Sequence, residues 1–475
     1  MILATAWKNV WRNRMRSMVV IASVTIGIFA GIFAIGLMNG TMEQRVDAAL
    51  NEEISHIQIN REGFTDNYDI TLSLDDIQEL NTRVRTIPGV EALANRSIIN
   101  AIANTATKSL GVQLVGVNPS QELEVFKLDK RLIPGTGSYL SEAGKNNLAF
   151  IGEDLAKELN IIRFSITRNT LDSLRSAYIP EETIQKLEPF VDKRYPSQKA
   201  FARDLKNVLS LKESGKYGKI ILEKAWTFRE RSKLTLSFLD RNNIQTGGMF
   251  RIAGIYDVDN SMFEKSQVFI LNRDLHRLTG LGANDYHVTI VKLSDREMTK
   301  EVTGEIKQAL PNLQVRNWKE ISPDLAMMTA MIEKFNVVFM LIILAALSFG
   351  IVNTMLMVVL ERTKELGMLT AIGMNKRKVF SMIMSESVFL SLVGGVAGMI
   401  VSRILLLITS RKGISFAGAQ EGFEAMGFSS HIYPTISNAF FIEVTILVII
   451  TGILSSIYPA LKALRLDPAE ALRTE

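Results

Sequence analysis

The sequence predicts a membrane α-helical protein, with four transmembrane helices and a large α/β (α+β) extracytoplasmic domain inserted between helices 1 and 2. Two observations predict this fold. Four stretches are apolar and long enough to cross a hydrocarbon core of roughly 30 Å, which takes about 20 helical residues. The first and second of these stretches are separated by about 295 residues in which strand-like and helix-like patterns alternate.

The composition excludes several classes of protein. The 475 residues are 47% hydrophobic and 22% charged, unlike disordered or collagen-like chains. The absence of cysteine excludes disulfide scaffolds, thiol catalysis and cysteine zinc sites, and the four histidines are scattered singly, so no metal site is expected. A net charge of +5 is small for this length, so nucleic acid is not an expected partner.

The first span, residues 18–38, contains no charged residue and follows a cytoplasmic amphipathic segment, residues 1–17. Its apolar run is too long for a signal peptide and lacks a small-residue cleavage site after it, so it is predicted to stay in the protein as an anchor. The other spans are predicted at residues 335–360, 379–409 and 440–458.

The charges beside the spans predict the orientation. Lys and Arg cluster before the first span, between the second and third, and after the fourth, whereas the loop of residues 410–439 holds only Arg411 and Lys412. Positive charge favours the cytoplasmic side. Both termini, the loop of residues 361–378 and the tail of residues 459–475 are therefore expected in the cytoplasm. Residues 39–334 and 410–439 are expected outside.

The outer domain, residues 39–334, shows mixed patterns. Alternating or short apolar runs predict strands at residues 54–59, 111–117, 147–151, 235–239, 249–256, 268–271, 286–293 and 313–318. Helical patterns occupy residues 74–84 and 295–310. A last helix from about Lys319 is predicted to continue into the second span as a rigid stalk; a break near Glu333 and Lys334 is the alternative.

Residues 163–230 differ from their surroundings because they are rich in Lys and Arg and mainly helical in pattern, at residues 181–195 and 198–211. We interpret them as an insertion into the outer domain. They serve either as a docking arm for a partner or as a solvated helical elaboration.

Two ionisable residues lie within the third span. Glu386 and Arg403 are each only six or seven residues from an end of that span, so snorkelling to the headgroups or hydrogen bonding between helices is expected, with a proton relay as the alternative. The glycines Gly394, Gly395 and Gly398 in the same span predict close packing of helices.

Catalytic motifs are missing from the sequence. It contains no P-loop, G-x-S-x-G or H-E-x-x-H pattern. The adjacent carboxylates Asp75-Asp76 and Glu153-Asp154 resemble the acids found at helix N-termini. This chain is therefore not expected to be an enzyme.

The loop ERTKELGMLTAIGMNKRK, residues 361–378, predicts a short helix. Thr363 is expected to cap it, and Gly373 suits the position just after its end. About nine residues are too few for a stable helix in water. Leu366, Leu369 and Ile372 recur at threes and form an apolar edge, which is expected to dock into a groove on a cytoplasmic partner or to lie on the membrane.

The tail YPALKALRLDPAEALRTE ends the chain. Its Asp467, Pro468 and Glu470 have the spacing of a capping box with proline at the first helical position. A plain amphipathic tail is the alternative.

These two segments resemble the coupling loop and C-terminal tail of MacB/FtsX/LolC-LolE-type (type VII) ABC transporter permeases. The order of one span, a large outer domain and three spans is similar too. The segments AWKNVWRNRMR at residues 6–16, LMNG at residues 37–40 and SHI at residues 55–57 are most similar to the LolC/LolE branch. Residues 163–230 depart from the family pattern.

The resemblance implies partners. It implies a bacterial inner (plasma) membrane protein with its large domain in the periplasm, working with a second permease that is either a copy of this chain or a paralogue. A cytoplasmic ABC ATPase dimer would bind ATP and Mg, leaving no cofactor in this chain. The residues implied to dock on the ATPase are Glu361, Arg362, Glu365, Leu366, Gly367, Leu369 and Gly373.

Three functions are compatible with the resemblance. The first is a permease that extracts lipoproteins from the outer leaflet of the inner membrane and passes them to a periplasmic carrier. The second is a MacB-like efflux or export permease. The third is an FtsX-like transmembrane regulator of a cell-wall hydrolase.

Overall fold

The computed structural model describes residues 2–144, 147–176, 179–195, 197–229 and 232–464. Two compact units make up the chain. The helical unit comprises Met1–Val46, Asp324–Gln420 and Ser429–Glu475, and the sheet unit comprises Asp47–Pro323 and Glu421–Phe428.

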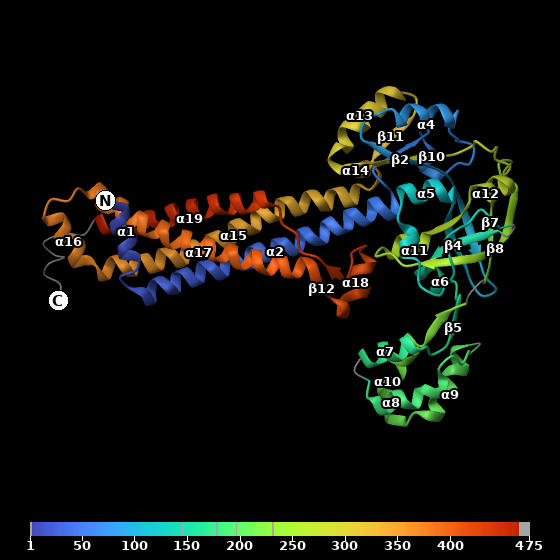
Figure 1. Ribbon diagram of the computed structural model, residues 1–475, viewed down its shortest axis with the longest axis horizontal. Helices are drawn as coiled ribbons and strands as arrows, with labels where there is room; N and C mark the ends of the chain where they lie inside the picture. The colour runs from blue at the N-terminus through green and yellow to red at the C-terminus, as the bar shows by residue number, and fades with distance from the viewer. Residues whose placement is uncertain (1, 145–146, 177–178, 196, 230–231, 465–475) are drawn as a thin grey trace. The chain divides into compact units, whose positions relative to one another are not determined.

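Four long helices form the helical unit: α2 (Arg14–Ala48), α15 (Pro323–Glu361), α17 (Lys376–Lys412) and α19 (Asn438–Leu464). Each is long and apolar enough to cross a membrane. All four begin or end outside the predicted spans, because the helical hydrogen bonding continues into the charged residues that flank each apolar stretch. Within the helical unit these helices lie side by side (Figure 1).

Small residues let α17 approach both α2 and α19 closely. A Cβ atom on Gly394 would lie 2.7 Å from the Cβ of Val24 on α2, and one on Gly395 would lie 2.9 Å from Val448 on α19. Thr25 also donates a hydrogen bond of 3.1 Å to the Gly394 carbonyl. The predicted role of these glycines in close helix packing is confirmed.

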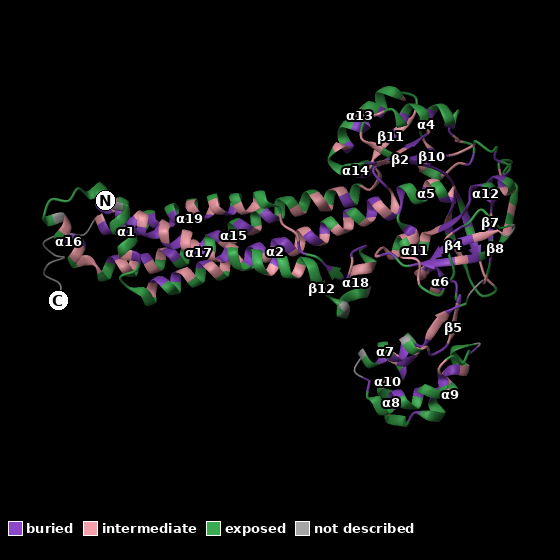
Figure 2. Ribbon diagram, viewed as in Figure 1, coloured by how far each residue is buried: buried purple, intermediate pink, exposed green. Residues whose placement is uncertain are grey.

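Each long helix of the helical unit has buried and exposed residues along its length (Figure 2), and many of the exposed ones are large and apolar. Ile28 and Ile32 of α2 are fully buried, whereas Ile26 of the same helix and Phe349 of α15 are 65% and 76% exposed. An exposed apolar surface of this extent suits hydrocarbon rather than water.

The helix predicted from Lys319 is two helices. The short α14 (Trp318–Ile321) is followed by Ser322, and α15 begins at Pro323 and runs unbroken to Glu361. The predicted start is wrong because proline has no N–H to continue a helix and restricts the residue before it, whereas it fits the first turn of a new one. The alternative break near Glu333 does not occur.

The sheet unit contains nine paired strands in the order β11-β1-β10-β2-β3-β9-β4-β8-β7. Their bounds are β1 (Ile57–Asn60), β2 (Val90–Asn104), β3 (Ser109–Val117), β4 (Leu148–Gly152), β7 (Lys233–Leu239), β8 (Gln245–Tyr256), β9 (Gln267–Leu271), β10 (Val288–Leu293) and β11 (Gln314–Asn317). Since β7 also pairs with β2, the six strands from β2 to β7 in this order close into a ring.

Strand β2 joins two parts of the sheet. Residues up to Arg96 pair with β10, residues from Ser97 pair with β3, and Ala101 to Asn104 also pair with β7. The sequence analysis missed this strand, although it is the longest of the nine. Its sequence, VEALANRSIINAIAN, mixes Ala, Asn, Arg and Glu with its apolar residues, so neither period 2 nor β-propensity marks it.

Helices cover the sheet. The helices α4 (Ile77–Arg85) and α13 (Thr299–Ala309) pack their apolar sides against the end formed by β1, β10 and β11, sharing a core that includes Leu80 and Val302. Four further helices were not predicted: α5 (Pro119–Val125), α6 (Glu153–Glu158), α11 (Ser261–Ser266) and α12 (Asn272–Thr279). Each has eight residues or fewer, too few for a clear helical period.

The insertion has its own core. Strands β5 (Ile162–Phe164) and β6 (Trp226–Phe228) pair at its base, and between them lie α7 (Arg168–Ser176), α8 (Glu181–Leu187), α9 (Gln198–Val208) and α10 (Leu211–Lys224). The helix predicted to reach residue 195 ends at Leu187 and is followed by a 3₁₀ turn at Glu188–Phe190, where Pro189 cannot continue the α-helical hydrogen bonding. Phe201 and Ile221 are fully buried within this helical cluster.

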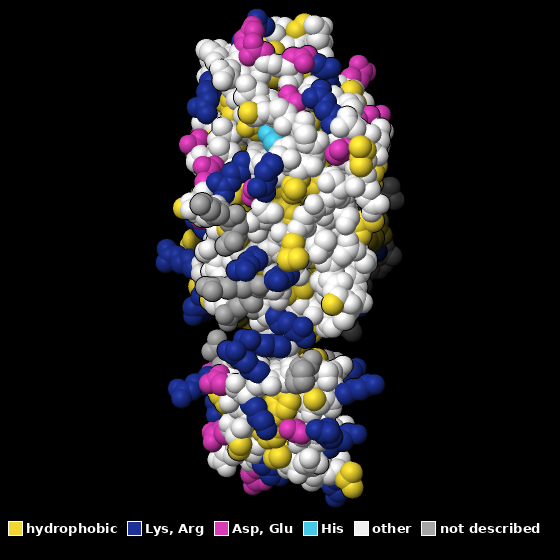
Figure 3. Space-filling view, turned by 90° about the vertical axis from the view of Figure 1, so that its right-hand side faces the viewer, with side chains coloured by type: hydrophobic (Ala, Val, Ile, Leu, Met, Phe, Trp, Pro, Cys, Tyr) yellow, Lys and Arg dark blue, Asp and Glu magenta, His cyan; other side chains and the backbone are white. Residues whose placement is uncertain are grey.

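The insertion also carries the chain's excess charge. Residues 163–230 contain 14 Lys and Arg against nine Asp and Glu, a net charge of +5 that equals the net charge of the whole chain. In Figure 3 the basic side chains are more numerous than the acidic ones on the visible face of this lobe, the lower one in the view.

Candidate functional site

The predicted coupling helix is present as α16 (Thr363–Ala371) and follows α15 after a single residue. Gly373 has a φ of +94°, the left-handed conformation that favours glycine after a helix end. The predicted cap is wrong. Thr363 lies inside the helix, where its hydroxyl donates to the carbonyls of Val359 and Leu360 and so continues the hydrogen bonding of α15.

The apolar edge of α16 is divided between two environments. Leu366 is only 3% exposed and lies in the core of the helical unit, and Gly367 is buried. Leu369 packs partly against the same core. Ile372 is 80% exposed. The expectation that Leu366 and Gly367 lie on a partner's surface is therefore wrong, because these residues anchor α16 to its own bundle.

The N-terminal segment forms the amphipathic helix α1 (Ile2–Val10), which packs against α17. Its residues Ala6 and Val10 are buried, and the Trp7 ring meets Phe389 of α17 edge-on, with 5.5 Å between the ring centroids. Trp7 and Trp11 remain 43% and 40% exposed. Tryptophan in this half-exposed position is typical of the boundary between lipid and water.

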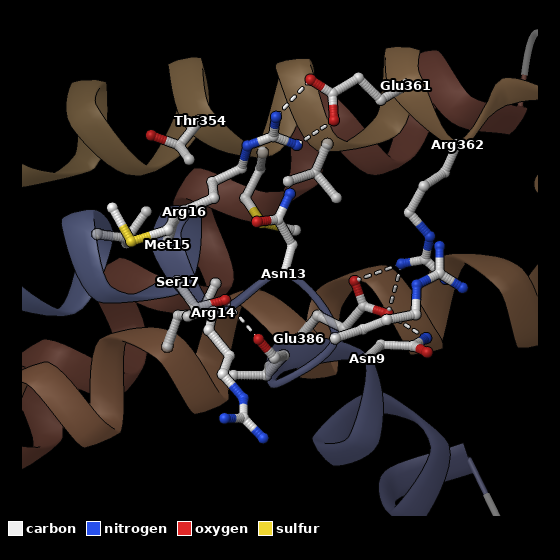
Figure 4. A pocket seen from close by; sticks show the side chains of 16 residues that line it. Asn9, Asn13, Arg14, Met15, Arg16, Ser17, Thr354, Glu361, Arg362 and Glu386 are labelled. Carbon is white, nitrogen blue, oxygen red and sulfur yellow. Dashed lines mark hydrogen bonds and ion pairs between the residues drawn. The ribbon is translucent and has the colours of Figure 1, made fainter.

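Glu386 is the centre of a buried polar cluster near α1 and α16. Its side chain is 4% exposed and accepts hydrogen bonds from the Asn9 amide at 2.6 Å and from Arg362 at 3.1 Å (Figure 4). The expectation that Glu386 snorkels is wrong; the alternative of a hydrogen bond between helices is confirmed. A buried carboxylate is stable in this position because an arginine and an amide satisfy it.

Two further carboxylates extend the cluster. Glu365 of α16 accepts from Arg12 at 2.5 Å and from Arg362 at 3.0 Å, and Glu361 accepts from both terminal nitrogens of Arg16. The hydrogen bond from Arg12 holds the pKa of Glu365 below its ordinary value, so this carboxyl is ionised at neutral pH. We call Asn9, Arg12, Arg16, Glu361, Arg362, Glu365 and Glu386 the ion-pair network.

The ion-pair network joins five helices of the chain. Asn9 comes from α1, Arg16 from the start of α2, Glu361 from the end of α15, Glu365 from α16 and Glu386 from α17, whereas Arg12 and Arg362 lie between helices. A displacement of α16 must therefore either carry Arg12 and Arg362 with it or break the hydrogen bonds of Glu365. The sequence analysis used Arg12 and Arg16 only to orient the first span and did not identify them as partners of the coupling helix.

Arg403 lies apart from this network. It is exposed on α17, with its guanidinium carbon 5.7 Å from the centre of the Phe441 ring. Seventeen residues of helix separate it from Glu386, a distance of roughly 25 Å. At this separation the two side chains do not exchange a proton directly, and the alternative of a proton or ion relay stays a prediction.

The remaining carboxylate candidates lie at the beginnings of helices. Asp76 caps α4 by accepting from the Glu79 amide at 3.2 Å, and Glu153 and Asp154 lie in the first turn of α6, as predicted. No group of three or more His, Asp or Glu residues that could hold a metal occurs in the described part of the chain. The predicted capping box at Asp467 lies outside the described residues.

Comparisons with known families match two parts of the chain. Residues 337–468 match the FtsX-like permease C-terminal model, and residues 17–166 match the MacB-like periplasmic core domain. The first match covers α16 and most of the ion-pair network's partners on α15 and α17. The second ends near the start of the helical insertion.

Similar proteins include ABC transporter components. The pyoverdine export ATP-binding/permease protein PvdT of Pseudomonas fluorescens is 31% identical over 205 residues, which are 41% of this chain and 28% of that protein. An uncharacterized ABC transporter permease of Methanocaldococcus jannaschii is 29% identical over 233 residues, 48% of this chain and 55% of that protein. The chain thus spans between a quarter and about half of the length of these relatives.

Among solved structures, the periplasmic region of MacB from Actinobacillus actinomycetemcomitans is similar over 57% of this chain and 91% of that one, at 13% identity and a TM-score of 0.28. A TM-score this low does not establish a shared fold. The relatives described here do not single out the LolC/LolE branch. The chain carries an FtsX-like permease C-terminal domain and a MacB-like periplasmic core domain, and it is similar to ABC transporter permeases.

Proposed function

We propose that this chain is the permease subunit of an ABC transporter that works by mechanotransmission. A separate cytoplasmic ATPase dimer binds ATP and Mg, and its closure moves α16. The ion-pair network carries this motion to α1, α2 and α17, and α15 carries it toward the outer domain. The observation that supports the proposal best is a chain of charged hydrogen bonds that begins on this short helix. Glu365 of α16 accepts from Arg12 and Arg362, and Arg362 also donates to Glu386 of α17, which accepts from Asn9 of α1.

The two sides of α16 suit this role. Leu366 anchors the helix in the bundle, whereas Met368 and Ile372 are 51% and 80% exposed and offer an apolar surface to the ATPase. A helix of nine residues gains most of its stability from such contacts. A short helix held on one side and docked on the other transmits displacement without bending.

The transported substrate is exported from the outer side of the membrane. The similarity to a pyoverdine export protein supports export of this kind. Extraction of lipoproteins, with transfer to a periplasmic carrier, is the second candidate and is favoured by the segments at residues 6–16 and 37–40. The complex contains two permeases, either two copies of this chain or this chain and a paralogue.

One substitution within α16 and one at the residue that follows it test the docking surface. Ile372→Asp changes an exposed residue, so it should abolish co-purification of the ATPase while leaving the thermal unfolding of the permease within about 0.5 kcal/mol of wild type. Leu366→Ala should instead lower stability by about 2–5 kcal/mol, because it empties part of the core.

Val208→Asp is the matched control, since Val208 is an exposed apolar residue of the insertion. It should leave co-purification intact. Undiminished capture of the ATPase by the Ile372→Asp protein would contradict the docking assignment.

The absence of cysteine makes the orientation directly measurable. Ile372→Cys should react with an impermeant maleimide only after the membrane is opened, whereas Lys212→Cys, on the exposed surface of α10, should react in intact cells stripped of any outer barrier. The reverse pattern would rule out a cytoplasmic coupling helix.

A further inference from the structure

A cavity of about 490 Å³ lies beside the ion-pair network, between the start of α2, the end of α15 and α17. Its lining combines arginine and asparagine side chains with the apolar side chains of Val20, Met355, Val358 and Leu390. A cavity lined by both cationic and apolar side chains is complementary to an amphiphile with an anionic headgroup.

The excess positive charge of the cavity resides on Arg14. Glu361 is paired with Arg16, Glu386 with Arg362, and Glu365 with Arg12, so each carboxylate has its own arginine. Arg14 lines the same cavity and forms no ion pair or hydrogen bond with any described residue. Its guanidinium therefore has all five of its N–H groups available to a bound anion.

The planar guanidinium fork of arginine is well suited to the oxygens of a phosphate. In Figure 4 the Arg14 guanidinium points away from the Asn13 amide, so Arg14 is the donor on which a bound phosphate would depend.

Residues typical of a membrane surface lie near the cavity in the chain. Trp7 and Trp11, which precede Arg14 in the chain, are half exposed as at a membrane surface. Met18, one helical turn beyond Arg14 on the same face of α2, is 49% exposed, and Ile26 further along that helix is 65% exposed. An acyl chain from a headgroup at Arg14 would lie along this apolar face.

We propose that this cavity is a binding site for one anionic phospholipid, with its phosphate held by Arg14 and its acyl chains on the exposed face of α2. The bound lipid lies against Arg16 and Arg362, whose partners fix α16. Lipid composition thereby adjusts how firmly the coupling helix is held. This site is independent of the transported substrate, and its binding can be measured without the ATPase.

The test uses the full chain, purified in a mild detergent and stripped of lipid. Native mass spectrometry should detect one added phosphatidylglycerol per chain, bound about tenfold more tightly than phosphatidylcholine, since a charge-assisted hydrogen bond is lost with a neutral headgroup. Arg14→Gln should lower the affinity for phosphatidylglycerol about tenfold, and Arg14→Lys should restore most of it.

Arg411→Gln is the matched control, because it removes an exposed charge from the opposite end of α17. It should bind phosphatidylglycerol as wild type does. Equal binding by the Arg14→Gln and Arg411→Gln proteins would overturn the proposal, as would equal binding of the two lipids. Displacement of phosphatidylglycerol by millimolar inorganic phosphate would also overturn it, because the site would then recognise a small anion rather than a lipid.

Discussion

Two buried ion pairs, one in each unit, differ in how many partners they have. In the sheet unit, Arg96 of β2 pairs with Glu122 of α5, and the rings of Phe126 and Phe269 lie over its guanidinium, 4.1 and 5.6 Å from the guanidinium carbon to the ring centres. In the helical unit, Glu386 shares Arg362 with Glu365 and also accepts from Asn9.

The difference indicates different roles. The Arg96 pair is enclosed by aromatic rings and joins strand β2 to the helix α5. Glu122 is the one carboxylate that forms an ion pair with Arg96 among the described residues, so the pair serves to fix the fold. The ion-pair network offers Arg362 two carboxylates, one buried and one half exposed, so Arg362 has a second partner if the proposed displacement of α16 breaks one of its hydrogen bonds. Burial holds the Arg96–Glu122 pair in one geometry. In the ion-pair network, shared partners allow Arg362 more than one hydrogen-bonded geometry.

The largest effect should come from removing one partner of the enclosed pair. Arg96→Ala should lower the free energy of unfolding of the sheet unit by about 3–5 kcal/mol, because Glu122 is left buried without a counter-charge. Urea unfolding followed by tryptophan fluorescence measures it. The exposed pair of Arg83 and Glu79 supplies the control, since Arg83→Ala should cost less than about 0.5 kcal/mol. Similar losses for the two variants would remove the distinction between enclosed and exposed pairs.

A smaller effect is expected in the network. Glu386→Ala should lower stability by about 2 kcal/mol, less than the enclosed pair, because Arg362 keeps its hydrogen bond to Glu365. Thermal unfolding in detergent measures the loss. A double substitution with Glu365→Ala should cost more than the sum of the two single losses, whereas strict additivity would show that the two carboxylates do not share Arg362.

The next effect is a dependence of the free energy of unfolding on pH, caused by the buried carboxyl group of Glu264. Burial raises the pKa of Glu264 to about 8, although the amides of Val258 and Asp154 donate to it. The folded protein then holds a proton that the unfolded chain releases near its ordinary pKa, so stability is present at low pH and is lost as pH rises toward 8.

The slope of stability against pH measures this effect. Between pH 6.5 and 8 it should be negative and at most about 1.4 kcal/mol per pH unit, and Glu264→Gln should reduce it. That window avoids a contribution from His56. Burial lowers the pKa of His56 to about 4, so its effect on the slope of stability against pH is confined to pH values under 6.5. An unchanged slope in the Gln variant would show that Glu264 is ionised in the folded protein.

The smallest effect should follow removal of the most highly charged region. In the β5–β6 pair Phe164 lies directly opposite Trp226, so an Asn-Gly turn can replace residues 165–225 without changing the register. The stability of the remaining sheet should change by about 1 kcal/mol or less, since the insertion has a separate core and its charges are mostly exposed. Loss of the sheet's cooperative unfolding would show that the insertion supports its host. Loss of transport with unchanged ATPase binding would support a docking arm.

The sequence by itself determined the four apolar helices, most strands of the outer domain and the presence of the insertion. These are local properties. The residues of an apolar run of about 20, or of an alternating strand such as β7, are enough to predict that the segment lies in hydrocarbon or has one face in a core. The local sequence was also enough to predict the short helix α16 and the glycine that follows its end.

Only the tertiary structure decided which side of each element is buried and which distant charges meet. The long strand β2 became a strand because β10, β3 and β7 supply its hydrogen bonds, despite a sequence of weak β-propensity. Leu366 and Ile372 have the same apolar character in the sequence, yet one is core and the other surface. Asn9 and Glu386 are 377 residues apart in the sequence, and the packing of α1 on α17 brings their side chains together. The energy of such a contact depends on the distance between the two groups in space. The amino-acid composition does not encode that distance.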